Sequence, residues 1–206
     1  MIPRLLSGAA LAALLCGGVL LGRDLYLRSK GALAGVLIDR AWAARLDDGR
    51  LHRPWPWADF TPVARLEVGR LGIDAPILSD ATGRTMAFGL GWIVGSAPLD
   101  AVAGSAAATG PVGRFGVTAV GGHRDTGAAF LEDLRVGDTL VLRTGAAPQR
   151  FRVVSLDVVD ARAARVAPPS DAAVDDGRRL LLVTCWPFRA AWHGNQRFVV
   201  ECALES

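Results

Sequence analysis

Residues 180–188, LLLVTCWPF, are an apolar run that ends on a cysteine followed by Trp-Pro. A cysteine acts as a nucleophile when a base or a cation holds it as the thiolate, because the free thiol is mostly protonated at neutral pH. The simpler interpretation is that Cys185 is a small buried residue, as free cysteines often are. The choice depends on which histidines and cations the fold brings near Cys185.

Histidine is the usual base for a cysteine nucleophile, and the chain has 3 histidines. We expect His52, in a Trp- and Pro-rich stretch, and His193, in the turn WHGNQ, to lie at the surface. His123 differs because it ends the apolar run AVGGHRDT, where adjacent glycines allow close backbone approach. A lone histidine at a strand end is more often structural. A histidine and a cysteine that each end a strand make His123 the candidate base.

An arginine is the candidate for stabilising an oxyanion. Residues 196–204, QRFVVECAL, are typical of a strand, in which alternation puts Arg197 and Cys202 on opposite faces. If this strand forms a hairpin with the strand that ends at Cys185, Arg197 lies beside Cys185 and Cys202 lies far from it. This geometry disfavours a Cys185–Cys202 disulfide, which is the structural alternative in an oxidising compartment.

Short strand-like segments with Gly and Pro turns dominate the chain from Val63 onward, and only residues 128–134 indicate a short helical turn. The expected strands are 63–78, which contains a glycine-centred turn, 115–122, 138–144, 149–159, 180–185 and 196–204. Residues 95–114 are expected to form a small-residue loop. This pattern predicts an all-β fold, either an antiparallel barrel or a sandwich.

The N-terminal part has a different composition. Residues 5–22 carry no charge and just reach the length of a transmembrane helix. A signal peptide is the competing interpretation, but no convincing A-x-A cleavage site follows the run. A lipoprotein signal would have a small residue before Cys16, where this chain has leucine. We expect a retained single-pass anchor with its N-terminus in the cytoplasm and the rest of the chain outside.

Two segments connect the expected anchor to the strands. Residues 25–50 show a loose helical pattern that ends at Asp48-Gly49, and residues 53–62 are too rich in Pro and Trp for a regular helix. We expect the second segment to be an extended strap with its indoles on the surface. The predicted domains are a membrane anchor (1–24), a helical stalk with the strap (25–60) and a catalytic β-barrel (61–206).

The balance of charge argues against nucleic acid as a partner. The chain has 206 residues with 23 Lys+Arg against 20 Asp+Glu, and the basic residues are spread along it rather than clustered.

The blocks around the candidate residues resemble those of sortases. AVGGHRDTGAAFLEDLRVGDTL resembles the G-H-R-D-T…F…L…D-L…G-D block, and LLVTCWPF resembles the T-L-x-T-C segment with its aromatic-Pro-Phe continuation. Arg197 follows at the expected distance. With WPWAD-x-x-PVARL at residues 55–66, the chain is most similar to the branch found in marine and other Gram-negative proteobacteria. The resemblance runs from about Trp55 to the end, and the three blocks in this order are specific together.

The resemblance implies a membrane-anchored cysteine transpeptidase on a closed eight-stranded β-barrel with short helices. In this reading Cys185 attacks the Thr carbonyl of an LPXTG-like sorting signal and forms a thioacyl intermediate. His123 protonates the leaving amine and later deprotonates the incoming one, while Arg197 holds the substrate carbonyl or oxyanion. Thr184 and Trp186 are expected to bind the substrate, and no metal or cofactor is implied.

The implied partners are an exported protein with a C-terminal LPXTG-like sorting signal and an amine acceptor, either peptidoglycan or a protein. The expected location is the inner membrane, with the catalytic domain on the periplasmic side. Leu181 stands where the family segment has Thr, and Trp186 replaces the more usual Tyr. These departures leave the sorting sequence open.

Three other readings compete. L,D-transpeptidases also use an exported cysteine, but their histidine and cysteine share one S-H-G-C-x-R motif, whereas His123 and Cys185 lie far apart in this sequence. A zinc site of His123, Cys185 and Cys202 lacks the paired short spacings of zinc ligands. The third reading is a membrane-anchored β domain that is not an enzyme. It does not explain why His123, Cys185 and Arg197 occur in this arrangement. The sortase reading is therefore favoured.

Overall fold

The computed structural model describes residues 2–100, 116–163, 178–192 and 194–205, with side chains from residue 14 onward. The chain divides into two compact units, Met1–Leu37 and Ile38–Ser206. His193 and most of the small-residue loop predicted at 95–114 lie outside the described residues.

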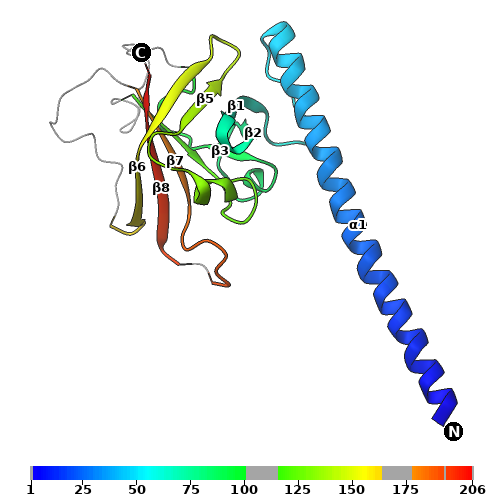
Figure 1. Cartoon of the computed structure of the whole chain (residues 1–206). Coiled ribbons are helices and arrows are strands. Elements are labelled where there is room, and N and C mark those ends of the chain that lie inside the picture. The colour runs from blue at the N-terminus through cyan, green and yellow to red at the C-terminus, as the bar shows by residue number, and fades with distance from the viewer. Residues whose placement is uncertain (1, 101–115, 164–177, 193, 206) are drawn as a thin grey trace. The chain divides into compact units, whose positions relative to one another are not determined.

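A single helix, α1 (Ile2–Asp48), replaces the two helical segments expected from the sequence (Figure 1). The intervening glycines each cost about 1 kcal/mol of helix propensity, which weakens a helix without ending it. The helix ends where the sequence predicts. Gly49 has a left-handed φ of 73° and its N–H donates to the Arg45 carbonyl at 2.8 Å, which is a glycine C-cap.

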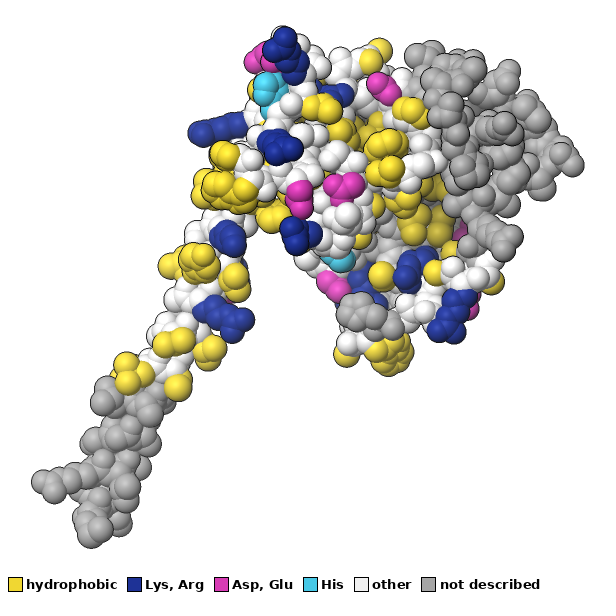
Figure 2. Space-filling model, turned by 180° about the vertical axis from the view of Figure 1, so that it is seen from behind, with side chains coloured by type: hydrophobic (Ala, Val, Ile, Leu, Met, Phe, Trp, Pro, Cys, Tyr) yellow, Lys and Arg dark blue, Asp and Glu magenta, His cyan; other side chains and the backbone are white. Residues whose placement is uncertain are grey.

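The described side chains of the first unit include a run of exposed apolar residues. Leu14, Leu15, Val19, Leu20 and Leu21 are each between 64% and 74% exposed, and apolar side chains line the described part of the helix in Figure 2. Within the part of the chain that the structure describes, no helix has a stretch both apolar and long enough to span a membrane. The expected anchor at 5–22 falls partly on residues whose side chains are not described.

Among the described residues, eight strands close into a barrel in the order β1-β2-β3-β4-β7-β8-β6-β5 (Figure 1). Their bounds are β1 (Pro62–Val68), β2 (Ile73–Leu78), β3 (Leu90–Trp92), β4 (Val117–Gly121), β5 (Thr139–Arg143), β6 (Gln149–Asp160), β7 (Arg179–Cys185) and β8 (Gln196–Leu204). Short 3₁₀ helices follow β1, β2 and β4: η1 (Gly69–Leu71), η2 (Thr85–Ala87) and η4 (Ala129–Asp133). The prediction of a closed eight-stranded barrel is confirmed.

Two features of the barrel differ from the sequence prediction. The pairs β2–β3 and β4–β7 are parallel, so the sheet is mixed rather than antiparallel. Strand β3 was not predicted, because three residues are too few to show an alternating pattern. The remaining strands and the helical turn at η4 agree with the prediction to within a few residues.

Alternation along each strand builds the core. In β1 every second residue is buried, and Ala64, Leu66 and Val68 point inward. Phe151 of β6 and Leu182 of β7 fill the same interior. Each such large side chain contributes about 1.5–3 kcal/mol by leaving water. The alternation also decides which residues of β7 and β8 face outward.

The strap packs against the barrel through aromatic rings. Phe60 is buried with Ile38 and Leu78, and Trp55 packs on this cluster, with its ring centroid 5.4 Å from that of Phe60. Trp57 is 82% exposed. The expectation of surface indoles therefore holds for Trp57, whereas Trp55 is partly buried.

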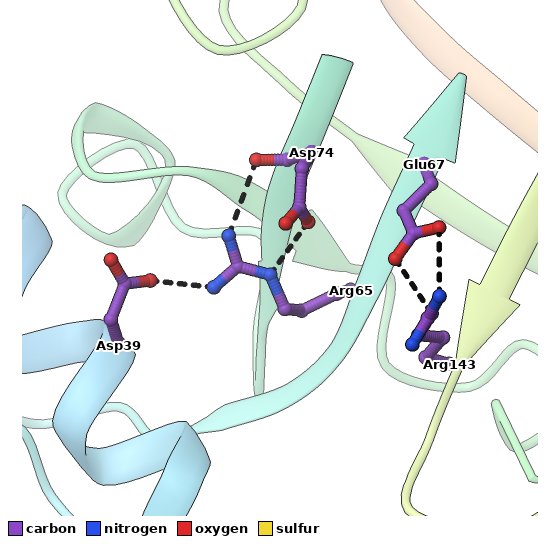
Figure 3. Close-up of polar contacts among 5 residues, drawn as sticks. All are labelled: Asp39, Arg65, Glu67, Asp74 and Arg143. Carbon is purple, nitrogen blue, oxygen red and sulfur yellow. Dashed lines mark hydrogen bonds and ion pairs between the residues drawn. The ribbon is translucent and has the colours of Figure 1, made fainter. Parts of the chain in front are cut away.

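Ion pairs join the end of α1 to the barrel within the second unit (Figure 3). Arg65 of β1 donates to Asp39 of α1 at 2.5 Å and to Asp74 of β2 at 2.6 Å. Beside them, Arg143 of β5 pairs with Glu67 of β1 at 2.6 Å. The Arg65–Asp39 bond holds the end of α1 on β1, and the other two pairs join β1 to β2 and β5.

Candidate active site

Strand β7 places Cys185 on the outside of the barrel wall. Leu180, Leu182 and Thr184 point inward and are at most 2% exposed, so alternation directs Cys185 outward, where its side chain is partly exposed. One further bond, from the Trp186 N–H to the Gln196 carbonyl at 3.0 Å, continues the pairing, and Pro187 has no N–H to extend it. The thiol therefore stands at the open end of the strand and is accessible to a reactant.

Strand β8 places Arg197 directly opposite Cys185 in an antiparallel pair. Directly opposed residues share a face of the sheet and lie about 5 Å apart at Cα. The side chains of Arg197 and Cys185 therefore project from the same outer face of the barrel. Arg197 Nη1 donates to the carbonyls of Gly194 at 3.1 Å and Gln196 at 2.9 Å. These bonds position the guanidinium, and both of them use the same nitrogen.

Strand β4 places His123 on the other side of Cys185. In the parallel β4–β7 pair, Gly121 is opposite Val183, and His123 and Cys185 each follow two residues later. The Gly122 N–H donates to the Val183 carbonyl at 3.1 Å, which extends the pairing toward His123. Because the strand order is β4-β7-β8, Cys185 lies between the histidine and the arginine.

The glycine before His123 is required by close packing. A β-carbon at Gly122 would lie 2.7 Å from the Ala128 β-carbon and 2.8 Å from Leu90 Cδ2, both too close for real atoms. Without a side chain, the backbone at Gly122 fits between Leu90 of β3 and Ala128. Of the two adjacent glycines, Gly122 is therefore the one that the packing beside His123 requires.

The imidazole of His123 is oriented by a backbone carbonyl. Nε2 lies 3.1 Å from the Gly83 carbonyl oxygen, and since a carbonyl only accepts, Nε2 carries a proton in this contact. Nδ1 remains for proton transfer. No hydrogen bond joins His123 to Cys185 among the described residues.

The loop that carries Gly83 is held by its own side chains. The Thr82 N–H donates to the Asp80 carboxylate at 2.9 Å, and the Thr85 N–H donates to the Thr82 hydroxyl at 3.3 Å. Although burial raises the pKa of Asp80, the hydrogen bonds from Thr82 and Thr85 hold it below its usual value. A well-ordered loop gives the Gly83 carbonyl a defined position against His123.

Thr184 and Trp186 take positions that the sequence does not reveal. The Thr184 hydroxyl is buried and donates to the Gly122 carbonyl at 2.7 Å, which ties β7 to the residue before His123. The Trp186 indole stacks on Phe198 with centroids 5.7 Å apart and meets Phe188 edge-on. It belongs to an aromatic cluster and is only partly exposed.

Cys202 lies away from the other site residues. It is opposite Leu180, five residues along β8 from Arg197, or about 17 Å at 3.4 Å per residue. Burial raises the pKa of the Cys202 thiol to about 12. Cys185 and Cys202 are both free thiols, so the disulfide alternative does not describe this structure.

Neither His52 nor a metal-binding cluster belongs to this site in the described part of the chain. His52 Nε2 contacts the Asp48 carboxylate at 3.0 Å rather than any candidate site residue. Across the described ranges, no group of three or more His, Cys, Asp or Glu side chains is placed to hold a metal ion.

A buried arginine beside His123 was missed by the sequence reasoning. The Arg124 side chain is 4% exposed, and its guanidinium donates to the carbonyls of Pro187, Ala190 and Trp192. The available signal was its position directly after the histidine in the quoted G-H-R-D-T block. Arginine is usually a surface residue, so sequence alone does not indicate burial.

Comparison with known proteins identifies one family for the barrel. The model of the sortase domain matches residues 66–205. Among the curated proteins compared, none matches the sequence of this chain.

Solved structures of sortases resemble this fold. Sortase A from Corynebacterium diphtheriae is 19% identical with a TM-score of 0.58, covering 73% of this chain and 63% of its own. Sortase C from Clostridium perfringens, determined with the C-terminal cell wall sorting motif, is 16% identical with a TM-score of 0.56, covering 86% of this chain and 90% of its own. A single-residue mutant of sortase E from Streptomyces avermitilis is 27% identical with a TM-score of 0.51, covering 70% and 88%. This chain thus spans less than two thirds of the Corynebacterium protein.

Proposed function

The chain belongs to the sortase family of cysteine transpeptidases, and we propose that it cleaves an LPXTG-like sorting signal and transfers the protein to an amine acceptor. The observation that carries the proposal is the placement of Cys185 between His123 and Arg197 on adjacent strands. A thiol, a proton-transfer group and a cation at one strand end are the parts that acyl transfer needs.

In the first step the Cys185 thiolate attacks the Thr carbonyl carbon of the sorting signal. The carbon–sulfur bond forms as the carbonyl oxygen takes the negative charge, and Arg197 donates to that oxygen. Removal of such a donor typically costs about 3–4 kcal/mol in the transition state. Collapse of the intermediate breaks the Thr–Gly amide bond, and His123 gives its proton to the leaving amine, which produces a thioester on Cys185.

In the second step an amine attacks the thioester. His123 takes a proton from the incoming nitrogen, the new amide bond forms, and Cys185 leaves as the thiolate. The enzyme returns to its starting protonation state. Water competes with the amine for the same thioester, so the acceptor determines whether the product is a conjugate or a hydrolysed protein.

The proposed partners are an exported protein with a C-terminal LPXTG-like signal and an amine on peptidoglycan or on a protein. A solved sortase C that was determined with a cell wall sorting motif supports this substrate class. Thr184 and Trp186 are proposed to belong to the region that binds the sorting signal. We also retain the assignment to the branch of marine and other Gram-negative proteobacteria, on the sequence blocks that suggest it.

The proposed location is the inner membrane, with α1 as the anchor and the barrel on the periplasmic side. The exposed apolar side chains of Leu14, Leu15, Val19, Leu20 and Leu21 support a lipid-facing surface on this part of the helix.

The test is a transfer assay with the full chain in detergent. A peptide with an LPXTG-like signal is incubated with and without an added amine, and products are identified by mass spectrometry. We expect a thioester on Cys185 and an amide conjugate that depends on the amine. Hydrolysis alone, with every amine offered, would replace transpeptidase by protease.

A further inference from the structure

Arg124 is a buried cation whose guanidinium is surrounded by backbone oxygens. Nη1 donates to the Pro187 carbonyl at 2.7 Å, and Nη2 donates to the carbonyls of Ala190 at 2.5 Å and Trp192 at 3.0 Å. Nε lies 3.3 Å from the Asp125 carboxylate. Burial of a charge is costly unless hydrogen bonds replace its water, and here the carbonyl dipoles do so.

All three carbonyls belong to the loop between β7 and β8, described at residues 186–192 and 194–195, which joins Cys185 to Arg197. A planar guanidinium with several fixed donors can gather carbonyls that are not neighbours in sequence, which a compact ammonium does less well. The loop is therefore folded around Arg124, and its two ends are the candidate nucleophile and the candidate oxyanion donor.

Strand β7 and the loop after it together hold the residues on both sides of His123. Before it, Gly122 bonds through its N–H to Val183 and through its carbonyl to the Thr184 hydroxyl. After it, Arg124 bonds to Pro187. The neighbours of His123 in sequence are thus fastened to residues that flank Cys185.

We propose that Arg124 is a positioning residue that sets the placement of His123, Cys185 and Arg197 by holding the β7–β8 loop against the His123 segment. The inference rests on the proposed function for its meaning in catalysis. Arg124 is not itself a catalytic residue, because its side chain is 4% exposed and its guanidinium is directed at the loop carbonyls.

The structure offers a matched control on the same two segments. Arg189 of the loop pairs with Glu132 of η4 at 2.9 Å, but these side chains are 83% and 37% exposed. Because solvent screens exposed charges, such an ion pair contributes little to the free energy of folding. Its loss should therefore leave both the loop and the reaction nearly unchanged.

The test compares Arg124→Lys and Arg124→Gln with Arg189→Ala in the full chain. Lysine keeps the charge but not the planar fork, so Arg124→Lys is expected to fold, while Arg124→Gln removes the charge. We expect kcat per folded molecule, measured well below each melting temperature, to fall roughly 10- to 100-fold in both Arg124 variants, since misplacement by about 1 Å can cost this much. Alkylation of Cys185 by iodoacetamide should persist, and Arg189→Ala should stay within about twofold of the wild type.

Amide hydrogen exchange in residues 186–196 gives a readout that needs no substrate. We expect exchange there to be at least about tenfold faster in the Arg124 variants, and unchanged in Arg189→Ala. Wild-type exchange in this loop, or faster exchange with unchanged kcat, would overturn the inference. A wild-type chain that turns over no sorting peptide would overturn the proposed function instead, and the exchange data would still decide whether Arg124 holds the loop.

Discussion

The two cysteines of the barrel show how position within one sheet separates a partly exposed thiol from a buried one. Cys185 faces outward at the end of β7, opposite Arg197. Cys202 faces the core, with no exposed surface, and burial raises its pKa to about 12. A thiol in that environment stays protonated at neutral pH and behaves as a small apolar residue.

Alanine substitutions should separate these roles. We expect Cys185→Ala and His123→Ala each to abolish cleavage of a fluorogenic sorting peptide, because one removes the nucleophile and the other the proton-transfer group. Cys202→Ala should keep kcat within about threefold, since a buried core residue far along β8 affects packing rather than chemistry. A large loss of turnover in Cys202→Ala would revive a role for the second thiol.

The Cys202 thiol should also shape stability in alkali. Its pKa is raised in the folded state, so its contribution to stability is full below the unfolded value of about 8.5–9 and is lost as pH rises toward 12. A shift of this size corresponds to roughly 4 kcal/mol at most. Urea unfolding between pH 8 and pH 11 should show a steeper loss in the wild type than in Cys202→Ala. Parallel slopes would contradict this prediction.

At the scale of elements, β4, β7 and β8 bring the chemistry together. The β7–β8 hairpin puts Cys185 and Arg197 on one outer face, and the parallel β4–β7 pair brings His123 to the same end. Thr184 connects these strands, because its inward hydroxyl bonds to the Gly122 carbonyl. The residue before Cys185 thus ties β7 to the segment that follows β4 and carries His123.

Thr184→Val tests whether this residue acts through structure or through substrate contact. The change leaves the Gly122 carbonyl without its partner, so we expect about 1–3 kcal/mol of lost stability together with a lower kcat. Thr184→Ser keeps the hydroxyl and should recover most of both. Thermal melting and peptide kinetics measure the two effects. A higher KM with unchanged stability would instead favour the substrate-binding role expected from the sequence.

At the scale of the whole molecule, the chain combines a barrel with a helix whose described early turns expose apolar side chains. Such residues are unfavourable in water and favourable in lipid, which is why the proposed function places this part of α1 in a membrane.

Charge placed in the apolar run should release the chain from membranes. We expect the double variant Val19→Arg and Leu20→Arg to move from the membrane fraction to the supernatant, because each arginine costs about 2.5–3.5 kcal/mol near the centre of a spanning helix. Leu51→Arg changes an exposed leucine outside the run, one that is 57% exposed, and should stay with the membrane. Recovery of the wild-type chain in the supernatant after cell fractionation would refute the anchor.

Much of the fold was predictable because strand signals are local. Apolar segments bounded by Gly and Pro indicate the strands β7 and β8, and the alternation in β8 also indicates which of its side chains face the core. The position of Cys202 away from Cys185 followed from the same alternation. Strand β3 was not predictable, since its three residues are defined by their neighbours rather than by a pattern.

The sequence by itself determined the strand ends that carry Cys185, His123 and Arg197, because apolar runs and the Gly and Pro residues beside them are local signals. Only the tertiary structure decided that β4 lies parallel to β7, that Thr184 bonds to Gly122, and that Arg124 is buried inside the loop after Cys185. These contacts join residues far apart in the chain. Their formation depends on which strands pack side by side, and local sequence preference does not specify that choice.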